Sequence, residues 1–390
     1  MKRFFPIVAT PVTLRDLLPV PWRGGRRLRM RLNAMYNGRG TFCFGSGAAA
    51  LSVLLQALKK LRPDATEVVI PVYTATAVLF AVRQAGLTPV LCDISLHDFN
   101  MDAGIVPRLL NGRTLAVIPT HMFGIPMYDI GHLSGGVSGI TVIEDAAQAL
   151  GSLVDGERAG SFADASLLSF NRGKNLPAAG GGCVTVHRED IAAAMADLVG
   201  NMGIGSLSLK ERAGIFARNN AFALAVRPRI YAAIRGLTAK LRERPSPQAI
   251  VVRRFSWYQS SVLDSLLNRH ELFGRKRYEN GMRALDRLKA DAGLILPEID
   301  LCRVRPAFNR LPLIAREVER LERIVHILHG SGFETSRMYV PLHREFPDLG
   351  YKTGDFSNAE FLAEHLITVP CHPFMDRNDI DRMCEAIRKA

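Results

Sequence analysis

The sequence predicts an α/β fold with a large domain over residues 1–254 and a smaller C-terminal α+β domain over 255–390. Three observations predict it. Short apolar runs alternate with helical patterns through the first half of the chain, which is typical of a mostly parallel sheet covered by helices on both faces. Near Arg254 the alternation of short apolar runs and helical patterns gives way to long helical patterns. A length of 390 residues leaves ample material for two packed units.

The strands of the large domain are expected where apolar runs of four to eight residues are bounded by turn residues. The expected strands are 41–45, 67–72, 88–94, 115–121, 141–146, 165–170 and 182–187. Helix-like stretches such as AAALSVLLQALKKL lie between the early ones. Ligands of such sheets bind beyond the carboxyl ends of the strands. After residue 254 we expect one long helix or two, strands near 306–314 and 367–370, and a terminal helix from about Asp379.

Composition restricts the class of protein. Hydrophobic residues make up 48% and charged residues 22%, so disorder is not expected to dominate. Six cysteines stand without a CxxC pair, which argues against a zinc site or a disulfide framework and predicts a reducing, cytoplasmic location. The N-terminal apolar stretch is short and interrupted by prolines and charges, so we do not expect a secretion signal.

The residues with the clearest chemistry follow two of these strands. Asp145 ends the run TVIED, and Lys174 follows 29 positions later in SFNRGKN, five residues after Ser169. Pyridoxal phosphate needs an amine for its aldehyde, an anion for its ring nitrogen and donors for its phosphate. Lys174, Asp145 and Ser169 could supply these in turn. A partly buried lysine with a lowered pKa would also be a good nucleophile and proton carrier.

Other residues fit the same site. Gln148 lies one helical turn after Asp145 and could bond the ring 3′-oxygen. The turn GSGAAAL follows a strand and opens a helix, so its backbone amides could hold a phosphate. His121, His343 and His372 are candidates for lining the site, although each is more commonly a structural residue.

These residues, taken together, resemble the DegT/StrS-type sugar aminotransferases. The resemblance covers residue 41 to the C-terminus and is carried by GSGAAAL, EVVIPVYTATAVLFAVRQAGLTPVLCDISLHDFNMD, RTLAVIPTHMFG, VIEDAAQALGS, RAGSFADASLLSFNRGKN and NAEFLAEHLITVPCHP. It implies the fold of type I pyridoxal phosphate enzymes, a homodimer and a keto-sugar nucleotide substrate. By the same resemblance, Lys174 binds the cofactor aldehyde, Asp145 the ring nitrogen and Gln148 the 3′-oxygen. The resemblance also implies that the cofactor phosphate is bound by Ser169 and the turn residues Ser46, Gly47 and Ala48.

The chain departs from the family pattern at several positions. Ala48 stands where the family usually has Thr, and Ala75 where an aromatic residue commonly stacks on the ring, with Tyr73 two residues away. Ser256 and Tyr258 replace an Asn that reaches the partner's phosphate and an Arg. These changes leave the chemistry possible but bear on substrate class and phosphate affinity.

An insertion of some thirty residues over the family norm falls within 203–250. Between residues 203 and 254 the chain has eleven Lys and Arg against two Glu, hence +9 of the total +13. Ile230, Ile234, Leu237 and Leu241 share one helical face, flanked by cations. This pattern is typical of a helix in a lipid interface and equally of one packed on its own domain or a partner. Few aromatic residues and no known motif argue against nucleic acid.

The sequence therefore predicts a pyridoxal phosphate-dependent aminotransferase that moves an amino group, from glutamate, to a keto-sugar nucleotide or a related glycan or lipid intermediate. Two alternatives stay open. A sugar dehydratase of the same family would tend to lack the lysine. A regulatory or scaffold protein with a decayed site would explain Ala48, Ala75 and Ser256.

Overall fold

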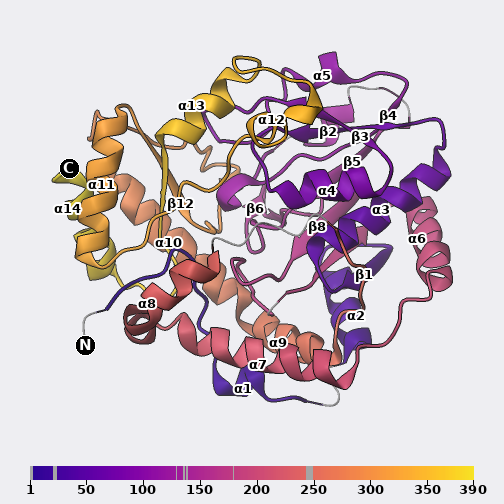
Figure 1. Ribbon diagram of the computed structural model, residues 1–390, viewed down its shortest axis with the longest axis horizontal. Coiled ribbons are helices and arrows are strands. Elements are labelled where there is room, and N and C mark those ends of the chain that lie inside the picture. Colours follow the sequence, from indigo (N-terminus) through magenta and orange to yellow (C-terminus); the bar gives the residue numbers. More distant parts are fainter. Residues whose placement is uncertain are drawn as a thin grey trace.

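The computed structural model describes residues 3–20, 24–128, 130–134, 137, 139–178, 180–242 and 249–390, with only the backbone of 237–242. Its centre is a seven-stranded sheet in the order β1-β9-β8-β5-β4-β2-β3 (Figure 1). The strands are β1 (Gly40–Phe44), β2 (Glu67–Pro71), β3 (Thr88–Cys92), β4 (Thr114–Val117), β5 (Thr141–Asp145), β8 (Ala165–Ser169) and β9 (Gly182–Val186). Strand β9 runs antiparallel to both of its neighbours, β1 and β8, and the other adjacent pairs are parallel. This sheet confirms the predicted α/β class.

Alternate residues of these strands pack against opposite layers. In β8, Leu167 joins the core formed with α3 and α4, whereas Leu168 joins the core formed with α2 and α9. The same alternation holds in β9, where Val184 and Cys183 point to opposite layers. The helices of the two layers are α2 (Gly25–Met35), α3 (Gly47–Leu61), α4 (Thr76–Gln84), α5 (Val106–Leu109), α6 (Glu189–Asn201) and α9 (Trp257–Leu266). The sheet is thus covered on both faces, as its continuous apolar strands require.

The C-terminal part forms a small antiparallel sheet in the order β10-β12-β13. Its strands are β10 (Leu294–Ile295), β12 (Leu311–Ala315) and β13 (Leu366–Val369), and its helices are α10 (His270–Leu288), α11 (Val318–Ser331), α12 (Leu342–Glu345), α13 (Ser357–His365) and α14 (Arg377–Arg388). A further sheet joins β11 (Val304–Arg305), β6 (Leu153–Val154) and β7 (Glu157–Arg158). The long helical stretch after residue 254 is two helices, separated by the 3₁₀ turn η3 (Leu267–Arg269). Further 3₁₀ turns are η1 (Met122–Gly124), η2 (Ile130–Ser134) and η4 (Pro347–Leu349). The division at residue 254 stays a prediction.

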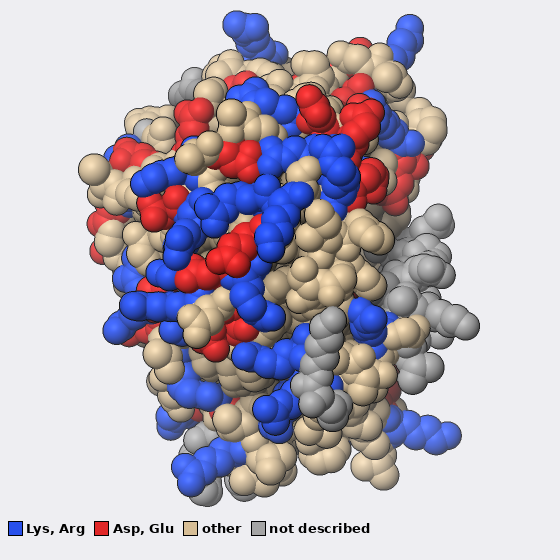
Figure 2. Space-filling model, turned by 90° about the vertical axis from the view of Figure 1, so that its left-hand side faces the viewer, with Lys and Arg blue, Asp and Glu red and all other residues tan. Residues whose placement is uncertain are grey.

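The N-terminal segment and the insertion lie at one end of the molecule. The short helix α1 (Leu14–Leu17) and the insertion helix α7 (Leu209–Ala225) both contact α9 and lie near the lower edge of Figure 1. Helix α8 (Pro228–Arg242) follows at the lower left of the same view. Figure 2 shows that acidic side chains gather in the upper part of one face, whereas its lower end is mainly basic or uncharged. None of the described helices is long and apolar enough to cross a membrane.

The predicted apolar stripe of α8 is only partly described. Ile230 is 36% exposed and Ile234 half-buried, and the side chains of Leu237, Leu241, Lys240 and Arg242 lie outside the described residues. Pro228 and Tyr231 are instead the buried residues of the first turn, and the Tyr231 hydroxyl donates to Glu334 Oε1 at 2.8 Å. The first half of α8 therefore packs on its own chain.

Candidate active site

The two predicted catalytic residues, Asp145 and Lys174, lie close to each other in the structure. Asp145 is the last residue of β5 and is buried; its backbone bonds Pro119 and His121 in the loop after β4. One carboxylate oxygen accepts a hydrogen bond from the Ala147 amide at 2.9 Å. Lys174, in the loop after β8, faces Asp145 closely enough for each charge to shift the pKa of the other. The carboxyl edge of the parallel sheet thus brings the acid and the amine together.

Burial dominates the electrostatics of this pair. It lowers the pKa of Lys174 to about 8, with Asp145 opposing the shift and Arg310 adding to it. Burial also raises the pKa of Asp145, against the opposing effects of Lys174 and the Ala147 amide. A lysine with so low a pKa is neutral in an appreciable fraction near pH 7–8, so it can act as a nucleophile and carry a proton.

The glycine turn lies beside Ser169. Ser46 caps α3, its hydroxyl accepting from the Ala49 amide at 3.1 Å, so the first amides of the helix, those of Gly47 and Ala48, have no partner within it. A Cβ added to Gly47 would stand 3.5 Å from Ser169 Oγ, and one added to Gly182 only 2.5 Å from Gly47 Cα. Glycine is therefore needed where β9 passes this turn. The positive end of α3 and a serine hydroxyl form a cradle suited to a phosphate.

Two buried polar atoms near Asp145 have no hydrogen-bond partner within the described chain. They are Gln148 Oε1 and Thr120 Oγ1. The Gln148 amide nitrogen lies 3.5 Å from both Met122 Sδ and Tyr339 Oη. Buried polar atoms are nearly always hydrogen-bonded, so these two indicate the place of a polar ligand. They fit pyridoxal phosphate, whose ring oxygen would reach Gln148.

A network missed by sequence reasoning holds the lysine loop in place. Asn309 donates to Gly173 O and to Asn175 Oδ1, both at 3.0 Å, on either side of Lys174. Arg310 donates through Nε to Asn309 Oδ1 at 3.2 Å, and its Nη2 lies 3.9 Å from the place of a Cβ on Gly173. Arg310 also acts electrostatically on Lys174 and Tyr339. No local pattern in the stretch AFNRLPL marks these residues, which lie more than 130 positions from the lysine.

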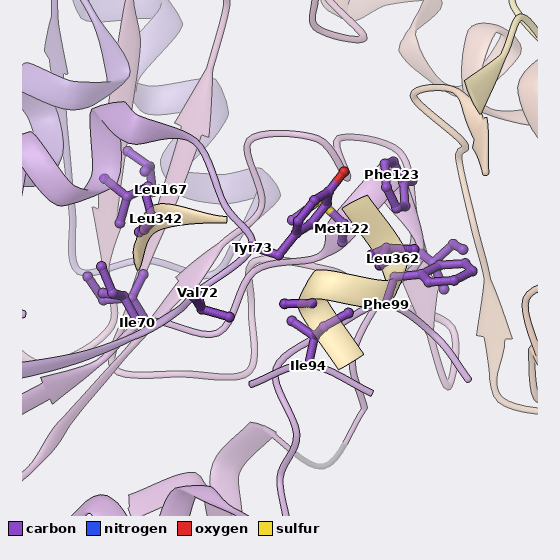
Figure 3. Close-up of a cluster of buried hydrophobic side chains, with 14 of the residues drawn as sticks. Ile70, Val72, Tyr73, Ile94, Phe99, Met122, Phe123, Leu167, Leu342 and Leu362 are labelled. Carbon is purple, nitrogen blue, oxygen red and sulfur yellow. The ribbon is translucent and has the colours of Figure 1, made fainter. Parts of the chain in front are cut away.

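The family-atypical positions have partners inside this chain. The Tyr73 hydroxyl donates to Arg337 O at 3.1 Å, and its ring meets that of Tyr339 edge-on at 5.6 Å. Figure 3 shows Tyr73 beside Met122, with Leu342 from the C-terminal part among the strand residues. Ala75 precedes α4 as its N-cap residue.

The start of α9 supports the glycine run after Lys174. Ser256 caps α9 by accepting from the Gln259 amide at 3.0 Å, and the Gln259 side chain donates to Gly180 O at 3.1 Å. Tyr258 is buried under α7, where its hydroxyl accepts from Asn220 at 3.1 Å. Ser256 and Tyr258 therefore both make contacts within this chain.

The three candidate histidines all have structural partners. His121 Nε2 lies 2.7 Å from Glu144 Oε1, and its Nδ1 accepts from the Met127 amide at 3.0 Å. His343 bonds Glu360 at 2.8 Å. His372 lies 2.9 Å from Pro6 O, and burial lowers its pKa to about 3. Of the three, His121 is the one whose charge would act on Asp145.

Comparison with known proteins settles the family. The sequence profile of the DegT/DnrJ/EryC1/StrS aminotransferase family matches residues 30–388. The chain belongs to that family. A UDP-N-acetyl-3-dehydro-alpha-D-glucosamine 3-aminotransferase of Acidithiobacillus ferrooxidans is 38% identical over 350 residues, covering 88% of this chain and 82% of that protein. A dTDP-3-amino-3,4,6-trideoxy-alpha-D-glucose transaminase of Micromonospora megalomicea subsp. nigra is 27% identical, covering 91% and 87%.

Solved structures agree on the fold. PseC from Helicobacter pylori, an aminotransferase involved in pseudoaminic acid biosynthesis, superposes with a TM-score of 0.78 at 19% identity, covering 100% of this chain and 99% of that one. Spr1654 from Streptococcus pneumoniae in its PLP-form gives 0.76 at 20% identity, covering 99% and 98%. Membership of the family makes this chain a pyridoxal phosphate-dependent sugar aminotransferase, as the sequence predicted. The two relatives named above are transaminases of nucleotide-linked sugars, one carrying UDP and the other dTDP.

Proposed function

We propose that this enzyme transfers the amino group of glutamate to the ketone of a UDP-linked sugar, with Lys174 and Asp145 as its catalytic residues. The observation that supports this most is the Lys174–Asp145 pair beside the Gly47–Ser169 cradle. The cofactor, when bound, supplies the electron sink through which an amino group passes between two carbonyl compounds. The rest of the chemistry falls to the chain's own residues.

Each residue has one task in this proposal. Lys174 Nζ binds the cofactor aldehyde and then carries a proton to and from the substrate carbon that bears nitrogen, for which a pKa of about 8 is well suited. The Asp145 carboxylate holds a positive charge on the ring nitrogen. Ser169 and the first amides of α3 hold the phosphate, and Gln148 Oε1 and Thr120 Oγ1 are polar groups left for the ring. We propose that it acts as a cytoplasmic homodimer.

The substrate is the part that an assay must test. The 38% identical relative acts on a UDP-linked 3-keto sugar, so this compound is the first to try. With ¹⁵N-glutamate, we expect the label in the sugar amine, at least about tenfold faster than with a dTDP-linked analogue, since one well-placed contact to a base is worth a factor of this size. If the cofactor-loaded enzyme transfers the label to none of the nucleotide-linked keto-sugars tested, the proposed substrate class is wrong.

Arg310 is proposed to bind a carboxylate of the amino donor. It places a cation beside Lys174, and Asn309 fixes its Nε. Charge-assisted hydrogen bonds to a carboxylate contribute about 1.5–3 kcal/mol, so Arg310→Gln is expected to raise KM for glutamate about 10- to 100-fold with KM for the sugar nucleotide unchanged. Loss of the cation should also raise the pKa of Lys174, so the pH range over which cofactor capture increases should move to higher pH.

A matched control lies at the other end of the same strand. Arg310 directly precedes β12 and Arg316 directly follows it, where its Nε bonds Ala292 O. Arg316→Gln makes the same change of charge and is expected to leave both KM values alone. A rise in KM for the sugar nucleotide in Arg310→Gln, with the glutamate KM unchanged, would assign Arg310 to a phosphate instead.

A further inference from the structure

Two basic segments far apart in the sequence are the basis of this inference. Residues 1–39 contain nine Lys and Arg against one Asp, and residues 203–254 contain eleven against two Glu. Together they carry +17, so the remaining 299 residues are net acidic at −4. The excess charge of the protein therefore resides in these two segments.

The fold brings the two segments to one end of the molecule. The Phe4 amide donates to Pro228 O at 3.1 Å, and the rings of Phe4 and Tyr231 lie 6.0 Å apart. A hollow of about 600 Å³ is lined from both sides, by Val12 and Thr13 before α1 and by Arg227–Ile230 at the start of α8. Helices α1, α2 and α7 all pack on α9. We call the surface formed by α1, α2, α7 and the start of α8 the basic end (Figure 1).

Some cations of the basic end are neutralised and others are not. Arg27 and Arg31 pair with the buried Asp264, and Arg253 pairs with Glu211. Another set is exposed to solvent and has no carboxylate within 4.0 Å among the residues that the structure describes. This set comprises Arg15, Arg29, Lys210, Arg212, Arg218, Arg227 and Arg229.

The same surface exposes large apolar side chains. On α7, Leu209 is 83% exposed, Phe216 47% and Leu224 45%, each about two turns from the next. Ala213, Ala217 and Ala221 are exposed between them, whereas Ile215, Asn219 and Ala223 face the core. Leu14, the first residue of α1, is 69% exposed, and Leu18, directly after that helix, is 59% exposed. Exposed apolar side chains of this size, gathered on one end, indicate an interaction surface.

We propose that the basic end docks on the surface of an anionic lipid bilayer. Its apolar side chains would enter the boundary between headgroups and acyl chains, and its arginines and lysine would meet the lipid phosphates. The combination of exposed leucines with surrounding cations is what such an interface requires. This docking surface differs from the predicted one, because α7 and α1, rather than the stripe of α8, supply the described apolar contacts.

Two other occupants fit less well. In a twofold-symmetric dimer, two copies of the same surface face each other. A dimer through the basic end would therefore place the unpaired cations of one protomer against those of the other, and they would repel. A nucleic acid would satisfy the charge but would leave Leu14, Leu18 and Leu209 without an apolar partner. A bilayer with anionic headgroups satisfies both the charge and the apolar side chains.

The test sediments the full-length, cofactor-loaded protein with vesicles of phosphatidylcholine alone or with about a third phosphatidylglycerol. We expect pelleting only with the anionic vesicles, and its loss near 1 M salt, where the Debye length falls to about 3 Å. Arg218→Gln with Arg227→Gln should weaken binding about 25-fold, since each cation near an anionic surface contributes about fivefold. Leu209→Asn with Leu224→Asn should weaken it at least about tenfold by the loss of apolar burial.

The control removes the same charge elsewhere. Arg108 on α5 and Lys352 before α13 are exposed at the far end, so Arg108→Gln with Lys352→Gln should pellet as the wild type does. Equal pelleting with both kinds of vesicle, or unchanged pelleting of both basic-end variants, overturns the proposal. The proposal is also overturned if the basic-end variants change the oligomeric mass of a protein that binds no vesicles, which would indicate a dimer interface. Binding of the protein to mixed-sequence DNA but not to vesicles would overturn it in the same way. Lys174→Ala should still pellet, which keeps this test separate from the proposed activity.

Discussion

Lys174→Ala is expected to abolish the visible absorption of the cofactor-loaded enzyme and to slow transamination by at least about 10³-fold. The reason lies in its surroundings. Burial and the nearby Arg310 lower its pKa to about 8 even though Asp145 opposes the shift. Alanine offers neither a nucleophile for the aldehyde nor a proton carrier. Absorbance scans during titration with pyridoxal phosphate, with single-turnover rates, measure both effects.

The pH dependence of the wild type follows from the same pKa. An ordinary lysine would be protonated up to about pH 10.4. In this site the amine becomes neutral as the pH rises through about 8, so the rate of cofactor capture should increase across that range and then level off. Arg172, two residues earlier and exposed, provides the control, and Arg172→Ala should keep the band. A visible band of wild-type strength in Lys174→Ala would show that another amine binds the cofactor.

The large sheet could be predicted from the sequence because its strands are apolar runs that end at polar residues. Each of the seven was expected within a few residues of its observed bounds. The run at 115–121 is the least accurate, since β4 ends at Val117, two residues before Pro119, which has no amide to donate to a ladder. The two-residue strands β6, β7, β10 and β11 were missed because so short a segment has no periodicity.

The parts of the site that could be predicted are those close in sequence to a recognisable strand end. Asp145 ends β5, Ser169 ends β8 and Lys174 lies in the loop after β8. Because the two strands are adjacent and parallel, these positions come together at one edge of the sheet. Arg310 and Tyr339 reach the same place from the C-terminal part, through contacts that no local pattern encodes. The burial of Tyr231 likewise depends on Phe4 and Glu334, which are far from Tyr231 and from each other in the sequence.

Asp145→Asn is the second substitution with a large expected effect. Asparagine keeps the shape of the side chain, and its Oδ1 can still accept from the Ala147 amide, but the negative charge is lost. Without that charge the ring nitrogen loses its counter-ion, and kcat should fall about 10²- to 10³-fold, the range found when one preorganised electrostatic contact is removed. Steady-state kinetics with saturating cofactor measure this loss.

Two further readouts separate a catalytic role of Asp145 from a structural one. Asp145 opposes the lowering of the Lys174 pKa, so Asp145→Asn should lower that pKa further and move the midpoint of cofactor capture below about pH 8. Burial raises the pKa of Asp145, so its ionised form destabilises the cofactor-free fold as the pH rises above the usual carboxyl range. The variant should therefore unfold at a temperature no lower than that of the wild type at pH 7. Asp98, whose pKa burial also raises, supplies the control, and Asp98→Asn should retain activity. An Asp145→Asn enzyme with wild-type kcat would mean that the ring nitrogen needs no carboxylate, and the proposed site would have to be oriented differently.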